Sequence, residues 1–114
     1  MIASYIPVNM LIATRTFAKR VAHAYPTQKA ILFGSRARGT EHDESGADVA
    51  IILKGAVGPL IKTKMEMNDI AYDILWDTGI CIQPLPIWEA EWVHPENYSN
   101  LYLLKNIARN GVTL

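Results

Sequence analysis

The stretch that most constrains the fold is residues 29–53, in which two apolar runs flank a polar turn that carries glycine. The first run, KAILF, ends at Gly34-Ser35, and the second, ADVAIIL, has Asp48 near its start. Both runs have the length and the branched apolar residues of buried β-strands. The sequence therefore predicts two strands, at residues 29–34 and 47–53.

The turn between these runs has the composition of an anion site. A strand that ends in Gly-Ser can direct backbone N–H groups and a hydroxyl toward a phosphate. Gly34 leaves room for the phosphate, and Ser35 can donate to it or cap a short helical turn predicted at residues 35–40. Asp48 can hold a metal ion beside it. A tight turn capped by serine is the simpler interpretation of the same residues.

The remaining elements follow from periodicity and from helix-breaking residues. Apolar residues at helical spacing predict helices at residues 9–25, 59–78 and 98–110, the second with Leu60 facing inward and Gly79 as its C-terminal stop. The apolar run ICIQPLPI predicts a third strand at residues 80–87. The prolines at 84 and 86 lie two apart, so their missing N–H groups fall on one side, and the segment is predicted to be an edge strand or to leave the sheet at Pro84. The order predicts an α/β (α+β) fold, a small mixed sheet of about three strands with helices packed against it. At 114 residues the chain has the length of one domain, residues 1–114.

Composition narrows the partners and the compartment. Lys plus Arg and Asp plus Glu number 11 each, and this neutral balance disfavours a nucleic acid as the main partner. The single cysteine, Cys81, fits a reducing compartment and is predicted to be a buried strand residue. No apolar stretch approaches the roughly 20 residues that span a bilayer. The N-terminus lacks the pattern of a signal peptide, so we expect a cytoplasmic protein.

Large aromatic residues are frequent in the C-terminal half of the chain. Packing in the core and at the edge of the domain is the favoured interpretation, and a partner-binding surface is the alternative. The residues are Trp76, Trp88, Trp92, Tyr98 and Tyr102.

The turn and its flanking strands resemble the minimal nucleotidyltransferase family, small members of the polymerase-β-type nucleotidyltransferase superfamily. The family motif reads Gly-Ser, ten residues, Asp, any residue, Asp, usually with Arg-Ala-Arg-Gly after the serine. The segments GICIQPLPIW and LLKNIARNGV are more weakly similar to the family's third strand and closing helix. The sequence agrees with the motif at Gly34, Ser35, Arg36, Ala37, Arg38, Gly39, Ser45 and Asp48.

The resemblance implies ATP and Mg²⁺ as cofactors. Gly34 and Ser35 would bind the triphosphate, and Asp48 would be a metal ligand. Arg36 or Arg38 would neutralise phosphate charge. In the family, two carboxylates two residues apart on a strand point to one face and hold the metal together.

One position departs from the motif. The first metal-binding Asp would stand at position 46, where this chain has Gly46. Asp43 or Glu44 would reach the site only through a rearrangement of the turn. A third carboxylate, which many relatives carry on the third strand, is missing there too, because Cys81 and Gln83 occupy one face of that strand.

Intact relatives of this kind are commonly paired with a helical HEPN-domain ribonuclease, as antitoxin and toxin. The resemblance therefore implies an antitoxin that transfers AMP from ATP to a HEPN-type toxin protein, with which it would form a hetero-oligomer. Gly46 would impair this transfer. The alternative is a catalytically inactive protein of the same fold that neutralises its partner by binding. A third is a small phosphate-binding domain unrelated to the family.

Overall fold

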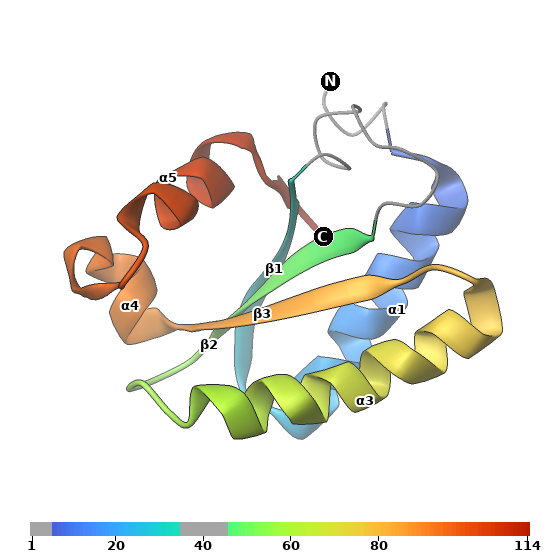
Figure 1. Ribbon diagram of the computed structural model, residues 1–114, viewed down its shortest axis with the longest axis horizontal. Helices are drawn as coiled ribbons and strands as arrows, with labels where there is room; N and C mark the ends of the chain where they lie inside the picture. The colour runs from blue at the N-terminus through green and yellow to red at the C-terminus, as the bar shows by residue number, and fades with distance from the viewer. Residues whose placement is uncertain (1–5, 35–45) are drawn as a thin grey trace.

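The computed structural model describes residues 6–34 and 46–114. Four strands form one mixed sheet in the order β3-β2-β1-β4 (Figure 1). β1 is antiparallel to both β2 and β4, whereas β2 and β3 are parallel. The strands are β1 (Thr27–Phe33), β2 (Ala47–Leu53), β3 (Ile82–Trp88) and β4 (Val112–Thr113).

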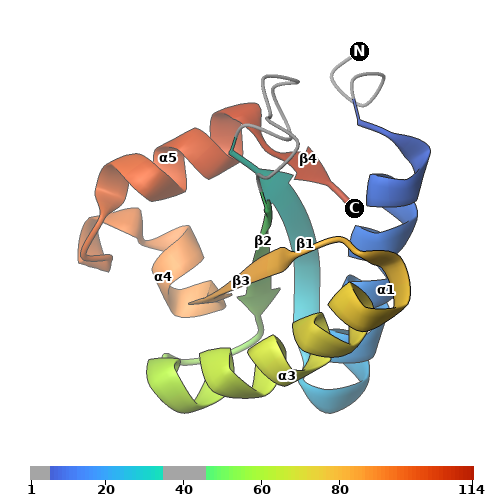
Figure 2. The same cartoon turned by 45° about the vertical axis from the view of Figure 1, so that its right-hand side comes forward.

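Helices cover both faces of the sheet (Figure 2). Two long helices lie on one face, and a short helix, a 3-10 turn and a third long helix lie on the other. The predicted α/β fold is confirmed, and the structure adds the short strand β4 and the helix α4. The helical elements are α1 (Val8–Ala24), α3 (Leu60–Thr78), α4 (Glu89–Val93), η2 (Pro95–Asn97) and α5 (Leu101–Asn110).

The larger core lies between the sheet and the two helices α1 and α3. Alternate residues of β1 and β2 point into it, among them Leu32, Val49 and Ile51, and all three are fully buried. Phe17 of α1 and Met67 of α3 complete its centre. A smaller cluster fills the opposite face, where Ile31, Ala50, Ile52 and Ile87 pack against Leu104 and Ile107 of α5.

The ends of the elements follow from local chemistry. α3 ends at Gly79, whose positive φ of 75° closes the helix in the left-handed conformation. β3 is an edge strand, as Pro84 and Pro86 predicted. Leu60, which we expected to face inward, is 45% exposed at the first turn of α3. Within the described residues, no helix has the length and apolar character that crossing a membrane requires.

Candidate functional site

The corner after β1 brings the predicted anion-binding turn against the predicted metal ligand. Gly34 directly follows β1 and has a φ of +77°, a conformation that glycine adopts readily. Phe33 pairs with Asp48 in the β1–β2 ladder, so Asp48 lies at the same end of the sheet. A Cβ atom on residue 34 would stand 2.6 Å from Oδ2 of Asp48. The carboxylate therefore lies against the backbone of the corner.

Asp48 is a partly buried acid without a second carboxylate two residues away. It lies on the same face of β2 as Ala50 and Ile52, at the second position of the strand. Burial raises the pKa of its carboxyl group above the ordinary value, because a low-dielectric environment disfavours the charged form. A cation or a hydrogen-bond donor brought to this corner would stabilise the ionised carboxylate.

The neighbouring strand places an amide where the motif would have an acid. Gln83 of β3 is the register partner of Asp48. A Cβ atom on Gly46 would stand 2.9 Å from Nε2 of Gln83 and 3.3 Å from the carbonyl oxygen of Cys81. That carbonyl accepts a hydrogen bond of 2.8 Å from the N–H of Ala47, which fixes the start of β2 against β3. The space in front of position 46 is thus filled by the Gln83 side chain.

This set of donors does not fit a two-metal centre. Within residues 6–34 and 46–114, no three His, Cys, Asp or Glu side chains gather closely enough to hold a metal ion. Mg²⁺ prefers oxygen ligands, and carboxylates supply most of the charge it needs. At the corner the described chain offers the carboxylate of Asp48, while Gly46 has no side chain and Gln83 is uncharged.

Several predicted site residues fall on the part of the chain between β1 and β2. Ser35, Arg36 and Arg38 lie outside the described residues, as do Asp43 and Glu44. Their assigned roles, and the predicted helical turn at residues 35–40, therefore stay predictions.

Two residues of the third strand differ from expectation. Cys81, predicted to be buried, is exposed and precedes β3. The sequence predicted a strand from residue 80, which would include Cys81, whereas β3 begins at Ile82. The sequence shows that Gln83 is not acidic, but strand periodicity does not predict that its side chain approaches Gly46. The sequence carried no direct signal for this approach, because it depends on the register between β2 and β3 and on β3 beginning at Ile82.

Comparisons with known proteins agree with this geometry. The family model described as "Polymerase beta, Nucleotidyltransferase" matches residues 18–114. The fold is similar to the crystal structure of a candidate nucleotidyltransferase from Sulfolobus solfataricus, with a TM-score of 0.61 and 20% sequence identity. That match covers 93% of this chain and 79% of the other. No curated protein matches the sequence.

Proposed function

The chain belongs to the polymerase beta nucleotidyltransferase family, and we propose that it is an antitoxin that neutralises a HEPN-type toxin mainly by binding it. Transfer of AMP to that partner is, in this proposal, weak or absent. The observation that carries the proposal is the pairing of Gly46 with Gln83 beside a single carboxylate, Asp48.

The chemistry of the family explains why this pairing matters. Nucleotidyl transfer needs charge stabilisation around the triphosphate, and the carboxylate pair of the motif holds the cations that supply it. Removing one preorganised group of this kind commonly lowers a rate by two to three orders of magnitude. At this corner both the first motif acid and an acid on the neighbouring strand are replaced by groups that cannot supply charge.

The corner keeps features that suit a nucleotide. Gly34 retains the positive φ and the close backbone approach that a phosphate-binding turn uses. Asp48 is kept although its burial disfavours its charge. These features support binding of ATP, with Mg²⁺ carried by the nucleotide and contacted by Asp48. Nucleotide binding would then modulate the partner interface.

The neutral charge of the chain supports a protein partner over a polynucleotide. The decisive experiment mixes the chain with its HEPN-type partner, with and without ATP and Mg²⁺, and measures both ribonuclease inhibition and AMP attached to the partner. We expect inhibition without ATP and little or no labelling. Inhibition that appears only with ATP, together with stoichiometric labelling, would overturn the proposal.

A second candidate, active AMP transfer, is favoured by the retention of Asp48 at the corner. It is tested by introducing aspartate at positions 46 and 83. Because Gln83 occupies the space in front of position 46, Gly46→Asp alone requires Gln83 to move, and we expect Gly46→Asp/Gln83→Asp to gain more. The double variant should label the partner at least tenfold more than the natural chain, and adding Asp48→Asn should abolish the gain. Strong labelling by the natural chain that Asp48→Asn removes would establish the second candidate.

A further inference from the structure

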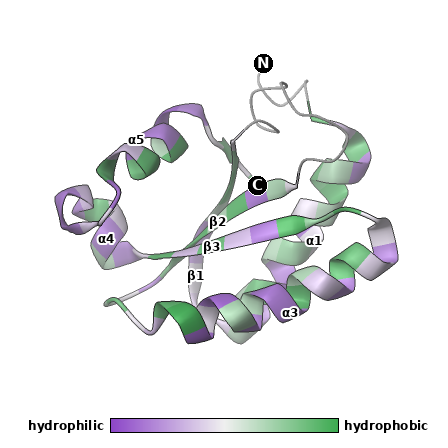
Figure 3. Cartoon of the chain, viewed as in Figure 1, coloured by the Kyte–Doolittle hydropathy of each residue, from purple (hydrophilic) through white to green (hydrophobic). Residues whose placement is uncertain are grey.

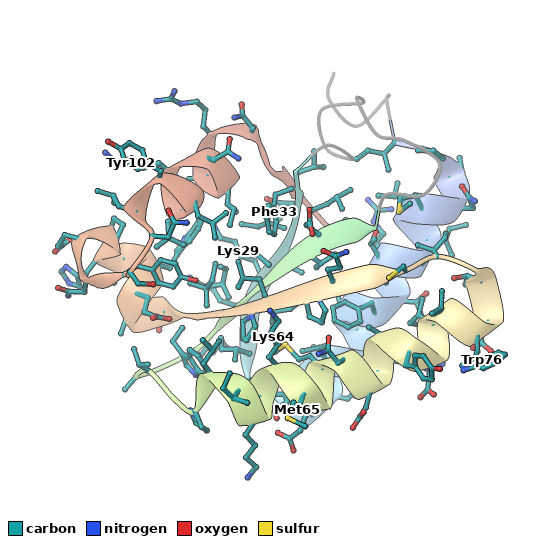
Figure 4. All side chains as sticks on the ribbon, viewed as in Figure 1. Lys29, Phe33, Lys64, Met65, Trp76 and Tyr102 are labelled. Carbon is teal, nitrogen blue, oxygen red and sulfur yellow. The ribbon has the colours of Figure 1, made fainter. Side chains whose placement is uncertain are left out.

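The outward side of α3 carries an apolar stripe with no partner among the described residues. Ile61, Met65, Tyr72 and Trp76 are 68%, 62%, 58% and 76% exposed. Their spacing of four, seven and four residues puts all of them on one side of the helix. The buried residues of α3, Thr63, Met67, Ala71 and Ile74, lie on the opposite side. Figure 4 shows Met65 and Trp76 on the side of α3 that points away from the sheet.

The composition of the stripe is more typical of a contact surface than of scattered surface residues. Tyr72 and Trp76 pack edge to face, with ring centroids 6.1 Å apart and an angle of 84° between the planes. This edge-to-face contact restricts both rings before a partner binds, so binding would cost these side chains little further conformational entropy. Figure 3 shows apolar residues along the whole length of α3, with polar residues between them. Exposed aromatic and methionine side chains are typical of the centres of protein interfaces.

Charge is segregated along the same helix. The basic residues of α3, Lys62 and Lys64, fall near its beginning, while the acids Asp69, Asp73 and Asp77 lie from its middle to its end. This order opposes the helix macrodipole, which favours acids at the N-terminus and bases at the C-terminus. Glu66, the remaining acid of α3, accepts a hydrogen bond from the hydroxyl of Tyr25. The order of these charges along α3 therefore gains no stability from the macrodipole of the helix.

An antiparallel copy of the same helix would complement both patterns. The pairs Ile61 and Trp76, and Met65 and Tyr72, share one midpoint, between Asn68 and Asp69. A two-fold axis at this point would pack the aliphatic half of one stripe against the aromatic half of the other, and would bring basic residues to acidic ones. We propose that the chain forms a symmetric homodimer through α3, with the stripe as its apolar centre. The proposal does not depend on the nucleotide site.

The two-fold axis also predicts which charges meet. In such a dimer each flank of the stripe faces the same flank of the other copy. Lys62 shares its flank with Asp69 and Asp73, whereas Lys64 lies on the other flank, which carries no acid. Lys62 would therefore approach Asp73 of the second copy. The two Asp69 carboxylates would lie near the axis and repel each other.

Sedimentation velocity on the full chain, from low to several hundred micromolar, tests the proposal. We expect a reversible monomer–dimer equilibrium in the micromolar range, because one helix pair is smaller than a standard interface. Trp76→Lys should raise the dissociation constant at least tenfold. Tyr102→Lys is the matched control, since Tyr102 is an aromatic of α5 that is 82% exposed and lies away from α3 (Figure 4). A monomer at every concentration, or equal dimerisation of Trp76→Lys and the natural chain, overturns the proposal.

Charge variants test the antiparallel arrangement separately. Lys62→Glu should weaken the dimer several-fold, and Lys62→Glu/Asp73→Lys should restore it. Lys64→Glu, on the flank without acids, should have less effect than Lys62→Glu. Asp69→Asn should tighten the dimer by removing the repulsion at the axis. Equal weakening by the two lysine variants, with no recovery in the charge-swapped double variant, would overturn this arrangement. Circular dichroism confirms that each variant is folded.

Discussion

The two faces of the sheet differ most at the end that carries the candidate site. On the face covered by α1 and α3, β2 contributes Ala47, Val49 and Ile51, and none of them is exposed. On the opposite face the same strand begins with Asp48, beside Phe33 of β1 and Gln83 of β3, and these three keep contact with solvent. Farther along that face, Ala50 and Ile52 belong to the buried cluster that includes Leu104 and Ile107 of α5, and Phe33 packs against this cluster.

This difference shows how one strand can serve stability and function at once. The residues of β2 alternate between the faces, so its odd-numbered positions build the larger core while position 48 remains free for chemistry. The carboxylate of Asp48 is only partly buried there, so its raised pKa costs less stability than full burial would. We therefore expect substitutions on the α1/α3 face to act on folding and those at the open end of the other face to act on binding.

The largest effect should come from the two phenylalanines of the chain, which lie one on each face. Phe17 is fully buried beneath α1, whereas Phe33 is partly exposed beside Asp48. Phe17→Ala should lower the free energy of unfolding by about 3–5 kcal/mol, through lost burial and a residual cavity. Phe33→Ala should cost less than half as much. Urea denaturation measures both, and equal losses would show that the two faces are not energetically distinct.

The second prediction concerns the contact between the backbone at Gly34 and the carboxylate of Asp48. Gly34 and Gly79 have almost the same positive φ, 77° and 75°, but a Cβ atom would meet Asp48 only at Gly34. Gly79→Ala should cost about 1 kcal/mol through left-handed strain, and Gly34→Ala about 1 kcal/mol more. Combining Gly34→Ala with Asp48→Ala should remove the excess. If both glycine variants lose the same stability, the carboxylate does not press on the corner.

Much of the fold could be predicted because its signals are local. The bounds of β2 were predicted correctly, since every residue of the strand except Asp48 is apolar and buried. Gly79 marked the end of α3, and the prolines marked β3 as an edge strand. The two-residue strand β4 has too few residues to leave a periodic signal, and it depends on pairing with Ile31 and Leu32 far away in the sequence.

The sequence predicted the part of the candidate site that follows from the pairing of two consecutive strands, and no more of it. Gly34 directly follows β1, and Asp48 lies near the start of the next, antiparallel strand, so the pairing of the two strands brings them to one end of the sheet. The approach of Gln83 to Gly46 depends instead on the register between β2 and β3, which the long α3 connection sets. Leu60 fits the helical stripe by spacing, but it lies in the first turn, beyond the edge of the sheet.

A smaller effect, on the free energy of unfolding, comes from Asp48 and depends on pH. The folded state holds the proton of Asp48 more tightly than the unfolded chain does, because burial raises the pKa of its carboxyl group. The stability that this proton contributes is present below the ordinary value of 3.8 and is lost as the pH rises through the raised pKa. Asp48→Asn should therefore be more stable than the natural chain at neutral pH.

The two unfolding curves should converge as the pH falls below the ordinary carboxyl range. Urea midpoints measured across this range give the difference directly. A variant that is less stable than the natural chain at neutral pH would mean that the ionised carboxylate is stabilised by groups that the described residues do not supply. Saturating ATP and Mg²⁺ should raise the midpoint of the natural chain more than that of Asp48→Asn, because ligands bind the folded state.

The smallest effect concerns how the helices of the less covered face are attached to the sheet. Nζ of Lys29, at the start of β1, lies 5.2 Å from the centroid of the Trp92 ring on α4. A cation–π contact at a partly exposed site contributes about 0.5–1 kcal/mol. Lys29→Met keeps the aliphatic stem but removes the charge, so it should lose about that amount. A double-mutant cycle with Trp92→Leu separates this contact from simple packing, since a coupling energy near zero would assign the whole attachment of α4 to apolar burial.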